Sequence, residues 1–238
     1  MESIKEKNIL VVGATGGVGS KAAKLLVAGG ANVFITGRNT EKLKQLGIQL
    51  NISASNQFRM DISSAAEIQH TADAIHSQIP AVDILIIASG IGIIKTMDAL
   101  SAEEFILTIN TNLTGPFLLI KALLPKMKEQ KKGLIINIPG VLGKVPMAGA
   151  AAYCASKYGL VGMMQSIREE IKRTEIRITN LYIGGIDSPF WDGIELRVQR
   201  EKMIDAEEAA KAIWFLCQQP RSGVVSEMVL QPFNHQAI

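Results

Sequence analysis

The amino-acid sequence predicts an α/β fold, a doubly wound parallel sheet with helices on both of its faces. Short apolar runs alternate with longer amphipathic stretches along the whole chain, as expected for consecutive βαβ units. Residues 83–88 are almost entirely apolar, which is typical of a strand buried on both faces of a parallel sheet. The chain has 238 residues, of which 47% are hydrophobic and 20% charged, with no internal repeat and no Pro/Gly-rich linker. We therefore expect one domain over residues 1–238.

The order of the elements follows from the same alternation. A first strand at 8–12 precedes a glycine cluster, and a first helix at 21–28 ends at Gly29-Gly30, a suitable C-cap. The third helix is expected to begin at Ser63 or Ser64, because serine is a favoured N-cap. Further strands are expected at residues 32–36, 58–60, 83–88, 133–138, 176–183 and 228–230. Further helices are expected at residues 41–46, 64–78, 101–110, 113–130, 149–173 and 205–218.

A glycine-rich loop between the first strand and the first helix predicts a nucleotide site. In doubly wound sheets, ligands bind at the carboxyl ends of the strands, and glycines let backbone N–H groups approach a pyrophosphate at a helix N-terminus. The spacing here is Gly-x-x-x-Gly-x-Gly with an additional Gly16, not the common Gly-x-Gly-x-x-Gly. The alternative is a glycine-rich turn of another α/β protein. The loop consists of Gly13, Ala14, Thr15, Gly16, Gly17, Val18 and Gly19.

The end of the second strand carries Arg38 and Asn39 and no acidic residue. An acid there would bind a free ribose 2′-hydroxyl, whereas an arginine accommodates a 2′-phosphate. We therefore expect NADP(H) rather than NAD(H), with Asn39 as a further donor; the alternative for Arg38 is a solvated loop residue. Asp61, after the third strand, is a candidate for binding the adenine amino group, and a helix-capping role is the alternative.

Tyr153 and Lys157 stand four residues apart, so they share one face of the predicted helix at 149–173. A nearby ammonium favours the phenolate, so we expect the pKa of Tyr153 to be lowered. A tyrosine tuned in this way exchanges a proton with an alcohol or a carbonyl. The alternative is an ordinary half-exposed helix face.

These features together resemble the short-chain dehydrogenase/reductase family over nearly the whole chain. The resemblance implies a single Rossmann-like domain. The matching features are the loop 13–19, Arg38, Asp61, Asp83-Ile84-Leu85-Ile86, Asn112, Gly133-Leu134-Ile135-Ile136-Asn137-Ile138, Tyr153 with Lys157, and Gly184-Gly185-Ile186-Asp187-Ser188-Pro189.

The resemblance also implies roles for individual residues. Tyr153 would act as the general acid/base, and Lys157 would lower its pKa and bind the nicotinamide ribose. Asn112 would hold a water of a proton relay at a kinked helix, the alternative being a helix-interior asparagine bonded to backbone. The positions implied in cofactor binding beyond the glycine loop are Arg38, Asn39, Asp61, Ile62, Ala88, Ser89, Gly90, Tyr153, Lys157, Ile186 and Ser188.

The sequence departs from the family pattern at several positions. The usual catalytic serine, thirteen residues before the tyrosine, is Gly140, which has no side-chain donor for a substrate oxygen. Loss of one such donor commonly costs ~10²–10³ in rate. The other departures are Val12 for a threonine, Ile183 for a proline, and Ile87-Ala88-Ser89-Gly90 for Asn-Asn-Ala-Gly.

The leading interpretation is an NADPH-dependent oxidoreductase in which Tyr153 handles the proton. The second, which Gly140 motivates, is an NADP(H)-binding sensor or scaffold with weak or no turnover. Related chemistry on the same fold, such as epimerisation or C=C reduction, is the third. The retained Tyr153, Lys157 and Asn112 favour an enzyme over a sensor.

The substrate is expected to be small and apolar or mixed. A lid around residues 188–204 offers an apolar front at 190–197, which Ile91, Ile93, Ile94 and Met147 could join; ordinary packing is the alternative. Lys144 or Arg197 could bind an acidic tail, although single charges are usually solvated.

Composition excludes several other classes. The net charge is only +3 and no basic stripe is interleaved with aromatic residues, so nucleic-acid binding is not expected. Two cysteines make no disulfide framework, and the three histidines show no metal-ligand spacing. The longest charge-free stretch, 105–120, is shorter than the ~20 residues of a membrane span. We expect a cytoplasmic protein that forms a homodimer or homotetramer, as the family often does.

Overall fold

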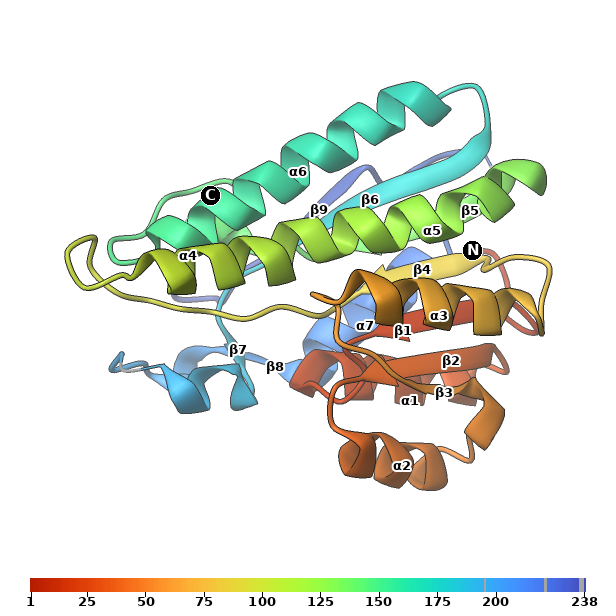
Figure 1. Ribbon diagram of the computed structural model, residues 1–238, viewed down its shortest axis with the longest axis horizontal. Helices are drawn as coiled ribbons and strands as arrows, with labels where there is room; N and C mark the ends of the chain where they lie inside the picture. The colour runs from red at the N-terminus through yellow and green to blue at the C-terminus, as the bar shows by residue number, and fades with distance from the viewer. Residues whose placement is uncertain (195, 221, 236–237) are drawn as a thin grey trace.

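A computed structural model describes residues 1–194, 196–220, 222–235 and 238. Among these residues, seven parallel strands form one sheet in the order β3-β2-β1-β4-β5-β6-β9 (Figure 1). The strand order reverses between β1 and β4, so the predicted doubly wound parallel sheet is confirmed. The strands are β1 (Asn8–Val12), β2 (Asn32–Gly37), β3 (Gln57–Arg59), β4 (Ile84–Ile87), β5 (Lys132–Asn137), β6 (Glu175–Ile183) and β9 (Glu227–Leu230).

The helices expected from the sequence are present, with shifted ends. The first begins at Gly17, four residues earlier than expected, because the glycine loop runs directly into the helix. The third is capped by Ser64, whose side chain accepts a hydrogen bond from the N–H of Glu67, and Ser63 is not the cap. The helices are α1 (Gly17–Ala28), α2 (Thr40–Gln49), α3 (Ala65–His76), α4 (Ala102–Ile109), α5 (Gly115–Glu129), α6 (Ala151–Ile171) and α7 (Ala206–Cys217).

Two apolar layers hold the helices on the sheet. Side chains of α1, α2 and α7 pack on one face, and those of α3, α5 and α6 pack on the other, in front of the sheet in Figure 1. The strands alternate between the layers: Val11 and Ile86 belong to the first, Leu10 and Leu85 to the second. With both faces covered, the central strands are buried, which explains their continuous apolar runs.

One helix on this face, formed by α4 and α5 together, is longer than the sequence predicts. Helices α4 and α5 are joined by a π-helical segment, Asn110–Thr114, into one helix spanning Ala102–Glu129. By length and composition it could cross a membrane, with a mean hydropathy of 1.2 over its most apolar window, which corrects the expectation that no such stretch exists. Core helices of soluble proteins pass the same test, and 44% of this window is buried against the rest of the fold.

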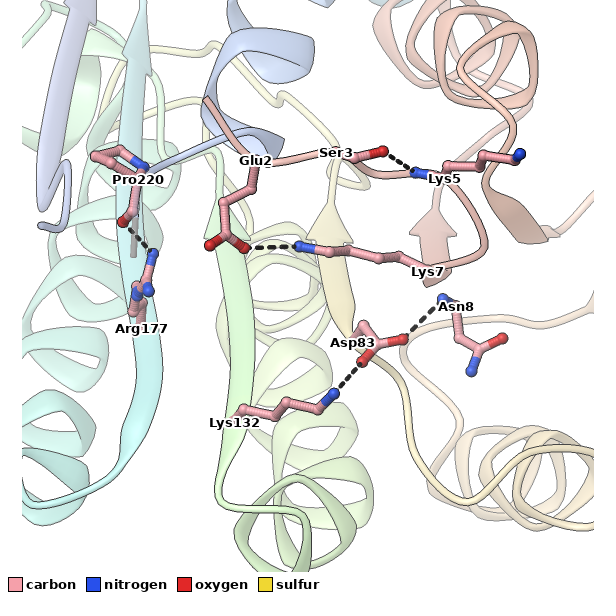
Figure 2. A network of polar contacts seen from close by, with 9 residues as sticks. All are labelled: Glu2, Ser3, Lys5, Lys7, Asn8, Asp83, Lys132, Arg177 and Pro220. Carbon is pink, nitrogen blue, oxygen red and sulfur yellow. Dashed lines mark hydrogen bonds and ion pairs between the residues drawn. The ribbon is translucent and has the colours of Figure 1, made fainter. Parts of the chain in front are cut away.

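The amino ends of the central strands are joined by polar contacts (Figure 2). The carboxylate of Asp83, just before β4, accepts a hydrogen bond at 2.9 Å from the backbone N–H of Asn8, the first residue of β1. Its other oxygen lies 3.9 Å from the ammonium of Lys132, the first residue of β5. These contacts join the amino ends of three strands, and the parallel pairing of the same strands brings the loops that follow them to the opposite, carboxyl edge.

A small second sheet near the carboxyl edge was not anticipated. Strands β7 (Ile186–Asp187) and β8 (Ile204–Asp205) pair in parallel and bracket the segment expected as a lid at 188–204. This segment contains the short 3-10 helices η4 (Pro189–Gly193) and η5 (Arg200–Lys202), while Glu195 lies outside the described residues. Two-residue strands carry no detectable alternation, so the sequence pattern could not reveal them.

Candidate active site

Two adjoining cavities open at the carboxyl ends of the strands. The smaller, of about 160 Å³, lies at the reversal between β1 and β4 and is lined by residues following β1, β2, β3 and β4. The larger, of about 560 Å³, extends toward α6 and the segment after β6. Both are lined by Gly16, Ala88, Ser89 and Gly90, so they form one continuous groove.

The glycine loop forms one wall of this groove. Gly13 has φ +82°, and a Cβ there would lie 2.8 Å from the backbone nitrogen of Ser89, so only glycine fits between the ends of β1 and β4. Gly13, Thr15 and Gly16 line the smaller cavity, and Gly16, Gly17 and Val18 line the larger one. Ala14 and Gly19 are buried beneath the loop and line neither cavity.

The end of β2 places Arg38 on the smaller cavity. Asn39 lies beside it and does not line the cavity; its side-chain oxygen accepts a hydrogen bond at 2.9 Å from the N–H of Lys42 and caps α2. This bond uses only the side-chain oxygen; the predicted donor role, which belongs to the amide nitrogen, stays a prediction.

Asp61 also lies beside the smaller cavity rather than on its wall, which its neighbours Met60 and Ile62 line. Burial opposes ionisation of its carboxyl, but hydrogen bonds from the N–H and hydroxyl of Ser63, together with the Arg38 charge, hold its pKa below the usual value. The carboxylate thus forms a turn with Ser63, while Ser64 caps α3.

Two buried hydroxyl groups in this region are unpaired. The Oγ1 of Thr36 and the Oγ of Ser89 have no hydrogen-bond partner among the described residues. Thr36 lines the smaller cavity and Ser89 lines both. Because unpaired buried hydroxyls are costly, their position favours a polar ligand in the groove.

Tyr153 and Lys157 occupy successive turns near the start of α6, and both line the larger cavity. The ammonium of Lys157 lies over the Tyr153 ring, 5.4 Å from its centroid, and donates a hydrogen bond at 3.4 Å to the carbonyl oxygen of Ile138. Lys157 is only 4% exposed. The two side chains predicted to act together are therefore brought together in the groove.

The electrostatic environment of this pair differs from the expectation. Burial raises the pKa of Tyr153 above its usual value, and burial lowers the pKa of Lys157 to about 8. The predicted lowering of the Tyr153 pKa is wrong for this arrangement, because burial removes the solvation of the phenolate and raises the pKa of this group.

Asn112 lies on the π-helical segment and is 1% exposed. Its side-chain oxygen accepts from the N–H of Ile91, and its amide group donates to the Ile91 carbonyl and to the hydroxyl of Ser156, all at 2.9–3.1 Å. Asn112 lines neither cavity, and it links the loop after β4 to helix α6 beside Lys157. The irregular helix expected here is the π-segment; the water relay stays a prediction.

Gly140 lines the larger cavity with φ +71° and ψ 171°, a conformation that is essentially restricted to glycine. A Cβ there would have room, its nearest neighbour being the carbonyl oxygen of Ile183 at 3.4 Å. The constraint at this position is therefore in the backbone and not in the surrounding space.

Replacing Gly140 by Ser is accordingly expected to destabilise the protein by about 1–3 kcal/mol, the cost of holding a side-chain residue in this region. Gly140→Ala is the matched control, since it carries the same strain without the hydroxyl. Urea unfolding and NADPH-dependent turnover of both variants check this, and we expect no gain of turnover in either. A large gain in the serine variant over both wild type and the alanine variant would contradict it and indicate an enzyme impaired by the missing hydroxyl.

The segment after β6 forms the far wall of the larger cavity. Ile186 and Ser188 line it; that they neighbour the nicotinamide stays a prediction. The ring of Phe190 lies 5.9 Å from that of Tyr153, and the Trp191 indole donates a hydrogen bond to the carbonyl of Ile186. Aromatic side chains of the expected lid thus cover the site.

Of the remaining residues expected to contact the substrate, some line the groove and others do not. Ile94 and Met147 line the larger cavity and Ile91 the smaller, whereas Ile93 lines neither. Lys144 forms an ion pair at 2.6 Å with Glu227, and neither it nor Arg197 lines the groove, so the expected recognition of an acidic tail has no support from their positions.

Sequence reasoning missed two parts of this wall. The larger cavity is also lined by His235, in the C-terminal tail, and by four apolar residues after β5: Val141, Leu142, Val145 and Pro146. A single histidine beyond the last strand carries no pattern that could have revealed it. Within the described part of the chain, no group of three His, Cys, Asp or Glu residues is placed to hold a metal ion.

Comparison with known proteins adds sequence and structural relatives. The family model described as short chain dehydrogenase matches residues 7–198. A 3-oxoacyl-[acyl-carrier-protein] reductase of Rickettsia felis is 32% identical over 96% of each chain, and an uncharacterized oxidoreductase of Staphylococcus epidermidis is 28% identical over 98% of this chain and 100% of the relative.

Solved structures agree with this result. A metagenomic short-chain oxidoreductase in complex with NADP is 28% identical with a TM-score of 0.82, covering 98% of this chain and 100% of that one. A variant of actinorhodin polyketide ketoreductase with NADPH is 26% identical with a TM-score of 0.85, covering 97% of each chain.

Proposed function

Since the chain belongs to the short-chain dehydrogenase family, we propose that it is an NADPH-dependent oxidoreductase acting on a carbonyl or alcohol group. The observation that carries the proposal is the continuous groove, which joins the glycine loop and Arg38 at one end to Tyr153 and Lys157 at the other. Such a groove fits an extended dinucleotide whose reactive end meets a proton donor.

The residues present fit this cofactor. The close approach of Gly13 to Ser89 leaves a side-chain-free cradle, and the unpaired hydroxyls of Thr36 and Ser89 are buried beside it. The loop 13–19 and residues 88–90 would hold the phosphates and ribose, and Arg38 the 2′-phosphate. When bound, NADPH supplies the hydride for the carbonyl carbon.

Side chains of the protein itself would transfer the proton to and from the substrate oxygen. Tyr153 would give its hydroxyl proton to the substrate oxygen in reduction and take it back in oxidation. The raised pKa of its phenol keeps it protonated at neutral pH, which suits the reductive direction. Lys157 would bind the nicotinamide ribose, and Asn112 would fix the loop after β4 and the water of the relay.

A second candidate function is an NADP(H)-binding sensor with little turnover, which the absence of a side-chain donor at Gly140 favours. A screen of aliphatic, aromatic and β-keto carbonyl compounds, in which the oxidation of NADPH is monitored by the loss of its absorbance, distinguishes the two functions. We expect turnover with at least one apolar compound. Tight NADPH binding without turnover in the whole set would instead support the sensor.

The substrate class we propose is a carbonyl on an apolar carbon skeleton. The larger cavity is walled mainly by aliphatic and aromatic side chains, among them Val141, Leu142, Met147 and Phe190. The relatives named as a 3-oxoacyl-[acyl-carrier-protein] reductase and a polyketide ketoreductase support this class.

Replacing Arg38 by Ala is expected to weaken NADPH binding about 10- to 100-fold, the equivalent of one charge-assisted hydrogen bond. NADH binding should be nearly unchanged, because NADH has no 2′-phosphate. Fluorescence titration with both cofactors checks this. Lys42→Ala, which removes an exposed charge on α2 outside the cavity lining, is the matched control. Equal losses for NADPH and NADH in the Arg38 variant would refute the phosphate role.

We also propose that the protein is cytoplasmic and acts as a homodimer or homotetramer. Exposed apolar side chains on α4, α5 and α6 support the assembly: Phe105, Ile106, Leu107, Phe117 and Tyr158. Light scattering after size-exclusion chromatography would measure the mass of the assembly, and a monomer would contradict the proposal.

A further inference from the structure

The C-terminal tail is folded against the end of β6. The N–H of Gly184 donates a hydrogen bond at 2.8 Å to the carbonyl of Leu230, which extends the pairing of β6 with β9. A Cβ on Gly184 would lie 2.6 Å from the Pro232 ring, so the tail packs directly on this residue. The side chain of Gln231 pairs with both backbone groups of Ile238, which closes the tail into a loop.

His235 lies within this loop and lines the larger cavity. Its backbone N–H donates to the carbonyl of Pro232 at 3.1 Å, which holds the turn that carries the imidazole. Within the described part of the chain the imidazole makes no hydrogen bond, and the residue is exposed at the cavity wall. The ring is therefore available to a bound molecule.

The tail and Gly140 flank the same strand end. The carbonyl oxygen of Ile183 is the nearest atom to a Cβ placed on Gly140. The next residue, Gly184, lies against the ring of Pro232. Gly140 and His235 both line the larger cavity, and the segments that carry them contact the consecutive residues Ile183 and Gly184.

Besides His235 and Tyr153, the polar side chains of this cavity either have a hydrogen-bond partner or lie beside the glycine loop. Lys157 donates to Ile138, and the Trp191 indole donates to Ile186. The backbone of Ser89 lies against Gly13, and Ser188 packs against Gly17, so both hydroxyls lie beside the glycine loop. Among the described residues that line the cavity away from the glycine loop, Tyr153 and His235 are the polar side chains without a hydrogen-bond partner.

We propose that His235 donates a hydrogen bond to the reacting oxygen of the substrate, in place of the side chain that Gly140 lacks. The inference rests on the proposed carbonyl reduction. An imidazole carries an N–H donor whether it is neutral or charged. Directed at the carbonyl oxygen, this donor stabilises the negative charge that develops as the carbon is reduced, while the proton itself comes from Tyr153.

The test compares His235→Ala and His235→Gln with the wild type, using NADPH and a series of para-substituted benzaldehydes. We expect kcat/KM of the alanine variant to fall about 10- to 100-fold, less than the ~10²–10³ of a fully buried donor because water partly replaces an exposed one. Glutamine keeps an N–H donor and should recover part of the loss. The dissociation constant for NADPH, from its fluorescence, should stay unchanged.

A further readout separates polarisation of the carbonyl from a merely structural role. Without the donor, the rate depends more on the intrinsic electrophilicity of the aldehyde, so the slope of log kcat against the substituent constant should steepen in the alanine variant. Phe233→Ala is the matched control, because Phe233 lies in the same tail and is 95% exposed. It should leave both the rate and the slope unchanged.

The outcomes are distinguishable. Wild-type rates and slope in His235→Ala would overturn the role of His235 and leave the proposed function intact. A loss shared equally by the alanine, glutamine and Phe233 variants would also overturn it, since it would report the fold of the tail. A wild-type protein that oxidises NADPH with none of the aldehydes would remove the reaction on which the inference rests.

Discussion

Replacing Tyr153 by Phe is expected to lower kcat for NADPH-dependent carbonyl reduction at least ~10²-fold, the low end of a general acid/base contribution. Phenylalanine keeps the ring, so the contacts with Phe190 and with the Lys157 ammonium survive and only the proton carrier is lost. NADPH binding should therefore persist, as measured by fluorescence titration.

Tyr158→Phe is the matched control for this experiment. Tyr158 lies on the same helix, is 44% exposed and lines neither cavity, so turnover should not change. Wild-type turnover in Tyr153→Phe would mean that another group supplies the proton and that the assignment of the reaction to this end of the groove is wrong.

Replacing Lys157 by Met is expected to abolish most turnover and at the same time to stabilise the protein. Turnover should fall at least ~10²-fold, because the phenol loses the ammonium beside it and the ribose loses its proposed partner. At pH 7 the folded wild type holds a buried ammonium whose pKa is lowered to about 8 from 10.5. Methionine removes the cost of burying this charge but also loses the hydrogen bond to Ile138. The net effect should be a rise in the free energy of unfolding of about 1–2 kcal/mol.

The pH dependence of this difference has a definite sign. Because the folded pKa of Lys157 lies below its unfolded value, the unfolded chain binds more protons between about pH 8 and pH 10.5. As the pH rises through this range, the free energy of unfolding of the wild type therefore increases relative to that of Lys157→Met. The extra stability of the variant is greatest below pH 8 and decreases above it. Urea unfolding at pH 7 and pH 10 measures it.

Lys172→Met serves as the control, since Lys172 is paired with Glu169 at the exposed end of α6. Its effect on stability should stay within about 0.5 kcal/mol. A Lys157→Met variant that is less stable than wild type at pH 7, or whose difference from wild type does not change with pH, would show that burial of this ammonium costs the fold little.

Much of the candidate site could be predicted because it follows from local order in the chain. The spacing of four residues places Tyr153 and Lys157 on one helix face in any helix, and both line the larger cavity. The glycine loop follows the first strand, and parallel strands bring the residues after β1, β2 and β4 to one edge. The positions of Arg38, Ser89 and Gly90 on that edge could therefore be anticipated.

Other expectations depended on contacts that no local pattern encodes. Asn39 and Asp61 stand at the expected strand ends, yet their side-chain oxygens bond to the backbone N–H groups of Lys42 and Ser63 beside the cavity. The role of His235 arises because the tail packs on Gly184, a residue more than forty positions earlier in the chain.

The sequence by itself determined the fold class, the place of the glycine loop and the pairing of Tyr153 with Lys157, because strand alternation, glycine spacing and helical periodicity are local properties. Only the tertiary structure decided the directions in which the pKa values of that pair shift, the positive φ of Gly140 and the cavity wall around it. The physical reason is that desolvation and backbone conformation at a site depend on which distant segments pack around it, and a sequence pattern carries no measure of that enclosure.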